Sequence, residues 1–149
     1  MQYSEGKIGC IFALRLEAGD MLPDTVEEFA REHGIQNAMV TYVGGAETGS
    51  RLVVGPEKDR GDDVVPIVHA LDGIHEVVAV GTIFPNESGN PVLHLHAAVG
   101  REGEASVGCT RPGVRVWLIG EVLIFEVLGL QGERKKDPRI GLELLQMPG

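Results

Sequence analysis

The chain has 149 residues, 43% of them hydrophobic, which suits one globular domain with an ordinary core. Its 22 acidic and 13 basic residues leave a formal net charge of −9, which repels nucleic-acid phosphates and anionic lipid surfaces. Because it has only two cysteines, Cys10 and Cys109, no apolar run near the roughly 20 residues that span a bilayer, and no signal-peptide pattern at its start, we expect a cytoplasmic protein without a disulfide framework or membrane contact.

The first predicted element is a strand at residues 8–16, where apolar side chains alternate with others. The alternating residues expected to share one face are Ile8, Cys10, Phe12, Leu14 and Leu16. The period then changes, and residues 22–33 predict the one convincing long helix. Pro23 suits its first turn and Gly34 its end.

Six further apolar runs follow, near residues 36–47, 50–55, 64–71, 74–84, 91–99 and 114–129. The clearest breaks between them are a loop at 55–63 and a turn at 85–90. These connections are too short for regular βαβ units. The sequence therefore predicts a single domain over residues 1–149, of α/β (α+β) class, with a mostly antiparallel sheet and one main helix.

Two histidines one residue apart stand in the predicted strand at 91–99. Since side chains alternate along a strand, His94 and His96 share one face, and Leu93 and Leu95 share the other. Two imidazoles at this spacing are able to converge on one ion. Cys109 is the best third donor, because its segment could return beside the histidine strand after a reversal around residues 101–106. This set predicts zinc or another divalent transition metal.

A plainer alternative stays open, in which the histidines are partly exposed strand residues and Cys109 is a small buried hydrophobe. Glu121 is an acid inside a long apolar strand, and it could orient a ligand histidine, bind an arginine or face water. The charged run at 134–136 is interpreted as a solvated turn. The common dinucleotide, P-loop, serine-hydrolase and zincin motifs are absent.

Four segments, in this order, resemble one known family. They are LRLEAGDMLPDTVEEFAREHGIQNAMVTYVGGAETG, IHEVVAVGTIF, HLHAAVGREGEASVGCTRPG and GEVLIFEV. The chain is similar over nearly its whole length to the PPC domain family, also called DUF296, which is shared by plants and prokaryotes. The resemblance implies an antiparallel sheet with a helix, assembled as a homotrimer.

The resemblance also implies a metal site, made in prokaryotic members from an H-x-H strand and a histidine in a following Gly-His motif. His94 and His96 match the first part, whereas the Gly-His position is Gly108-Cys109 in this chain. Plant members bind DNA through AT-hooks, and this chain has no such motif. For this reason direct DNA binding is not expected from the chain itself.

Three hypotheses follow for the function. The first, which we favour, is a metal-binding homotrimeric module for a small molecule or a protein, with His94, His96 and Cys109 as ligands. The second is a metal-dependent hydrolase or lyase, with Glu121 or Glu76 as candidate catalytic base. The third is a DNA-associated regulator that acts through its assembly or a partner.

Overall fold

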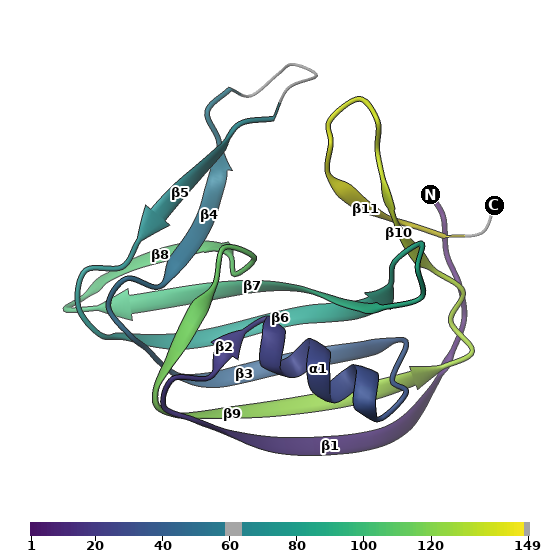
Figure 1. Ribbon diagram of the computed structural model, residues 1–149, viewed down its shortest axis with the longest axis horizontal. Helices are drawn as coiled ribbons and strands as arrows, with labels where there is room; N and C mark the ends of the chain where they lie inside the picture. Colours follow the sequence, from purple (N-terminus) through teal and green to yellow (C-terminus); the bar gives the residue numbers. More distant parts are fainter. Residues whose placement is uncertain (59–63, 148–149) are drawn as a thin grey trace.

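The described part of the chain is built on one nine-stranded sheet with a single long helix (Figure 1). This computed structural model describes residues 1–58 and 64–147, so the predicted loop at 55–63 lies largely outside the described residues. The strand order is β1-β9-β3-β6-β7-β8-β4-β5, with β2 also paired to β9 and a separate hairpin of β10 and β11. Among the named strands of the described chain every pairing is antiparallel, which confirms the predicted class.

The elements in chain order are β1 (Lys7–Glu17), β2 (Met21–Leu22), α1 (Asp24–Glu32), β3 (Ala38–Ala46), β4 (Arg51–Pro56), β5 (Pro66–Ala70), β6 (His75–Pro85), β7 (Pro91–Arg101), β8 (Glu104–Cys109), β9 (Val114–Leu128), β10 (Glu133–Lys136) and β11 (Glu143–Gln146). The six predicted apolar runs correspond to β3, β4, β5, β6, β7 and β9. Strand β8 and the hairpin of β10 and β11 were not among them.

The helix begins two residues later than predicted. Leu22 pairs with Val114 of β9 instead of joining the helix, and Pro23 occupies the cap position. Val26 and Ala30 are fully buried against the sheet. The Glu27 carboxylate accepts a hydrogen bond from the backbone N–H of Leu93 at 2.8 Å, which ties α1 to β7. The helix therefore covers the core face of the strand that carries the two histidines.

The prediction of which side chains of β1 share one face is correct only for the second half of the strand. Phe12, Leu14 and Leu16 pack toward the core, whereas Ile8 and Cys10 are exposed. The register shifts between Ile8 and Ile11, so that Gly9 and Cys10 together oppose the single residue Glu126. This β-bulge reverses the alternation before it, which a strict period of two does not anticipate.

The face of the sheet opposite the helix is rich in exposed apolar side chains. Residues that pair directly across strands share a face, so the register places seven of them together. They are 42% to 62% exposed and form what is here termed the open-face patch: Ile11, Met39, Val43, Val78, Val80, Val107 and Leu123. His94 and His96 lie on the same face, opposite Thr82 and Val80 of β6.

The run at residues 134–136 forms β10, and the interpretation as a solvated turn was wrong for Arg134. This side chain is 4% exposed, and its guanidinium donates to the backbone oxygens of Val92 and Thr82 and to the Thr82 hydroxyl at 3.1 to 3.3 Å. It also lies 5.9 Å from the centre of the Phe84 ring. These partners are 42 to 52 residues away, so the local charge pattern could not indicate them.

Gly81 allows β6 and β7 to approach at the level of the histidines. A Cβ at this position would meet the backbone oxygen of His94 and would lie 2.7 Å from the Cα of Leu95. We expect Gly81→Ala to lower the free energy of unfolding by about 1–3 kcal/mol, because backbone must shift to make room. Urea unfolding measures this.

The matched control is Gly100→Ala on β7, where the added Cβ finds only an ordinary contact of 3.6 Å. This variant should stay within about 1 kcal/mol of the parent protein. Equal stability of the two variants would contradict the tight approach at Gly81.

Candidate metal centre

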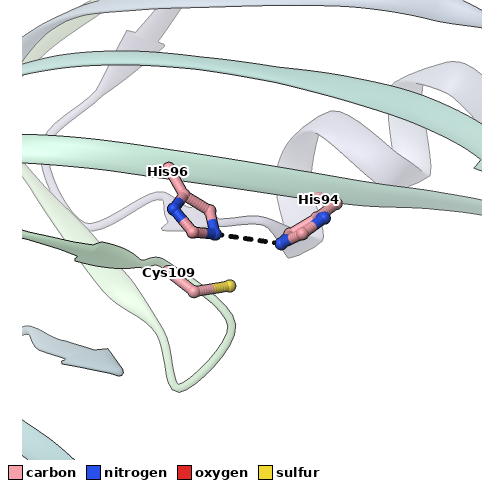
Figure 2. Close-up of side chains that lie close together, drawn as sticks. All are labelled: His94, His96 and Cys109. Carbon is pink, nitrogen blue, oxygen red and sulfur yellow. Dashed lines mark hydrogen bonds between the residues drawn. The ribbon is translucent and has the colours of Figure 1, made fainter. Parts of the chain in front are cut away.

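His94 and His96 point to the same side of β7, as the alternation predicts. Leu93 and Leu95 are buried on the other side, whereas His94 is half-buried and His96 is exposed. The two Nε2 atoms lie 3.0 Å apart and face each other (Figure 2). The buried leucines thus fix the strand while leaving both rings able to share an ion.

Cys109 joins the histidines from the end of β8. It pairs directly with His96 in the sheet register and is 8% exposed. One donor atom from each of the three residues lies within 4.8 Å of the other two. Figure 2 shows the cysteine sulfur beside the two facing ring nitrogens. The return of the chain after the reversal at residues 102–103 places this donor, as the sequence predicted.

The donor set fits a tetrahedral ion such as zinc. Two nitrogens bound at 2.0–2.1 Å to such an ion lie about 3.3 Å apart, and a nitrogen and a thiolate sulfur lie about 3.6 Å apart. The separations in this structure differ from these by amounts that side-chain rotation supplies. Three protein donors leave a fourth position for an external ligand.

Burial keeps the His94 ring neutral, which is the form that binds a metal. Its pKa is lowered to about 4, first by desolvation and then by the positive charges of Arg134 and Arg111 and by His96. Arg134 itself has a lowered pKa, with burial as the main cause and Arg111 next. The guanidinium groups of Arg111 and Arg134 therefore place positive charge beside the three donors, although the chain as a whole is acidic.

A cleft of about 560 Å³ opens beside the three donors. One wall comes from β4 and the start of β5, including Val53, Val54 and Pro66, and another from the hairpin side, including Leu142 and Leu144. Figure 1 shows these two strand pairs rising from the sheet on either side of β7 and β8. The three candidate metal ligands and Arg111 all line this cleft, so a bound ligand would contact both the metal ligands and the arginine.

Neither candidate base lies beside the histidines within one chain. Glu121 is exposed on β9, which is separated from β7 by β3 and β6, so about 14 Å of sheet divides them. Glu76 is on the adjacent strand β6 but pairs with Gly100, four residues or about 13 Å along β7 from His96. The exposed position of Glu121 matches the alternative in which it faces water.

Sequence reasoning did not single out Arg111 or Arg134 for this site. Arg111 is two residues after Cys109, and this proximity was a usable signal once the cysteine was chosen. Arg134 carried no such signal, because it reaches the site through the C-terminal hairpin.

The sequence profile of the Plants and Prokaryotes Conserved (PCC) domain matches residues 3–128. The chain belongs to this family. It is the PPC family that the sequence resembles, and a plant- and prokaryote-conserved protein from Pyrococcus horikoshii has the same fold, with a TM-score of 0.85 and 22% identity over 100% of this chain and 99% of that one.

Two other proteins are similar to this chain. The metal-containing protein of Archaeoglobus fulgidus is 25% identical, with a TM-score of 0.84, and the match covers 98% of this chain and 99% of that one. The bifunctional protein GlmU of Synechococcus sp. (strain JA-3-3Ab) is 28% identical over 137 residues. That match covers 90% of this chain and 20% of the relative, so the chain spans about a fifth of that protein.

A third solved structure, from Bacteroides thetaiotaomicron, is named as a candidate DNA-binding protein. It is 19% identical over 99% of both chains, with a TM-score of 0.74, and so it shows the fold alone. Over residues 1–58 and 64–147, no helix has the length and apolar character needed to cross a membrane.

Proposed function

We propose that this PCC domain protein is a metal-binding, self-associating module that holds a small molecule or a protein segment. The observation that carries the proposal is the convergence of His94, His96 and Cys109, whose donor atoms lie within 4.8 Å of one another beside a cleft. The metal-containing relative from Archaeoglobus fulgidus adds support. Zinc is the expected metal, because imidazole and thiolate donors favour it over magnesium and calcium.

The test is the metal content of protein purified without chelators and then supplied with zinc. About one tightly held zinc ion per chain is expected, as one set of three donors requires. Substoichiometric zinc after removal of excess metal would reject the site. In that case the histidines would be ordinary strand residues.

The proposed self-association is as a homotrimer. The family resemblance motivates the number of chains, and the open-face patch supplies an apolar surface that a second copy would cover. Because His94 and His96 share this face, assembly would also bring surfaces of neighbouring chains toward the metal centre.

A metal-dependent hydrolase or lyase is the second candidate, favoured by the cleft beside a three-donor set. A zinc ion held there would supply Lewis acidity and an acidified water. The chain's own residues would hold the metal and form an apolar enclosure. Since Glu76 and Glu121 lie far from the histidines in one chain, either would need to approach from a neighbouring subunit. Turnover that a chelator abolishes would favour this candidate over a binding module.

Duplex DNA is expected to bind weakly to the purified protein. A net charge of −9 opposes contact with phosphates, and the sequence has no AT-hook. We expect a dissociation constant above about 100 µM at physiological salt, measured by fluorescence anisotropy with a labelled duplex. Salt-dependent binding at nanomolar concentration would instead support the DNA-associated regulator.

A further inference from the structure

We propose that the cleft binds a monocarboxylate with a short apolar chain, its carboxylate held by Arg111 beside the metal and its chain held between the two strand pairs. This inference rests on the proposed function and names a ligand class for that site.

Arg111 supplies a guanidinium that has no acidic partner among the described residues. Arg111 is exposed, lines the cleft and lies two residues beyond Cys109. Among the residues that the structure describes, no carboxylate lies within ion-pair distance of it. An arginine presents a planar fork of donors that matches both oxygens of a carboxylate. A carboxylate at Arg111 would therefore lie next to the open position of a metal held by Cys109.

The second positive group is buried nearby. Arg134 is 4% exposed and is satisfied by neutral acceptors on Thr82 and Val92, the first of which pairs with His94. Its direct hydrogen-bond partners are neutral, and the carboxylates of Glu143 and Glu27 act on it only through space. A single negative charge in the cleft would be attracted by both arginines and by the metal.

The walls of the cleft are apolar. Val53, Val54 and Pro66 form one side, with Leu142 and Leu144 on the other. A ligand with only an acid group, such as acetate, would leave these walls in contact with water. Each methylene that the walls cover is removed from water, so a chain of several carbons should add to the affinity.

The surrounding charge favours a monoanion over a dianion. Glu143 lines the same cleft, and the chain carries nine excess negative charges. A phosphate monoester would bring a second negative charge, which both Glu143 and the net negative charge of the chain would repel. A carboxylic acid of moderate length therefore satisfies the arginines with the least repulsion.

The experiment uses zinc-loaded protein whose zinc content is measured first. Calorimetric titration compares hexanoate with hexanol, acetate and hexyl phosphate. Hexanoate should bind at least about tenfold more tightly than each of the others. In cobalt-substituted protein, hexanoate should also shift the visible absorption of the metal, because the carboxylate lies beside it.

Arg111→Gln should weaken hexanoate binding by at least about tenfold and leave the zinc content unchanged. Arg31→Gln, which removes the same charge from the exposed side of α1, is the matched control and should bind as the parent protein does. Full zinc with equal binding of hexanoate and hexanol, tighter binding of hexyl phosphate, or no effect of Arg111→Gln would overturn this inference and leave the metal site standing. Loss of zinc itself would reject the proposed function, and the ligand inference with it.

Discussion

Replacing His94 and His96 together with Ala is expected to abolish zinc binding, with a fall in affinity of more than about 100-fold. Two of three donors are lost, and Cys109 alone cannot hold an ion against water. The fold should survive, because Leu93 and Leu95 on the core side of β7 are unchanged. In metal-free buffer, the melting temperatures of the parent protein and the variant should agree within about 4 °C.

Three further variants sharpen this prediction. Cys109→His should keep zinc, since it restores the histidine that the family resemblance implies, and Cys109→Ser should lose most of the affinity. His69→Ala removes an exposed histidine of β5 outside the cluster and should bind zinc normally. Stoichiometric zinc in the double-histidine variant would refute the assignment of these donors.

If the protein assembles as the proposed homotrimer, Val78→Glu is expected to convert it into a monomer. Val78 is 60% exposed within one chain and lies in the middle of the open-face patch, on the central strand β6. A carboxylate there would be stripped of water in the assembly without a partner, which costs several kcal/mol for each subunit. Light scattering should show a threefold fall in mass, with the folded far-ultraviolet spectrum retained.

The control for this variant is Ala18→Glu, which adds the same charge in the exposed turn after β1. It should keep the mass of the parent protein. A monomeric parent protein at micromolar concentration, or a Val78→Glu variant with the parent's mass, would reject association through the open-face patch.

Local patterns predicted much of the fold and the placement of the two histidines in the candidate metal site. The alternation in β7 separated His94 and His96 from Leu93 and Leu95, because a regular strand in a sheet with one buried face obeys a period of two. The helix was also placed within two residues at its start and one at its end. The difference at its start arose because Leu22 pairs with Val114 of β9, a contact that helix propensity does not encode.

Long-range contacts account for what the sequence did not predict. Arg134 belongs to a run that resembles a solvated turn, and only the folded chain brings the backbone oxygens of Thr82 and Val92 to its guanidinium. Glu121 stands in an apolar stretch of sequence, which suggested a buried acid with a partner, but its side chain is on an exposed face of β9. Side-chain pattern identifies the face of a strand, but the neighbours of that face depend on the strand order.

The bulge in β1 affects whether copies of this protein can aggregate through the edges of their sheets. An unpaired sheet edge is a template on which further chains can add one after another into filaments. At one edge the two-residue bulge distorts β1, and the N–H of Cys10 is engaged by the Glu126 carboxylate. At the other edge, β5 is a short strand that starts with Pro66, which has no N–H to offer. Continued edge-to-edge addition is therefore disfavoured at both edges of the sheet, and concentrated protein should remain free of fibrils even though the open-face patch favours contact between chains.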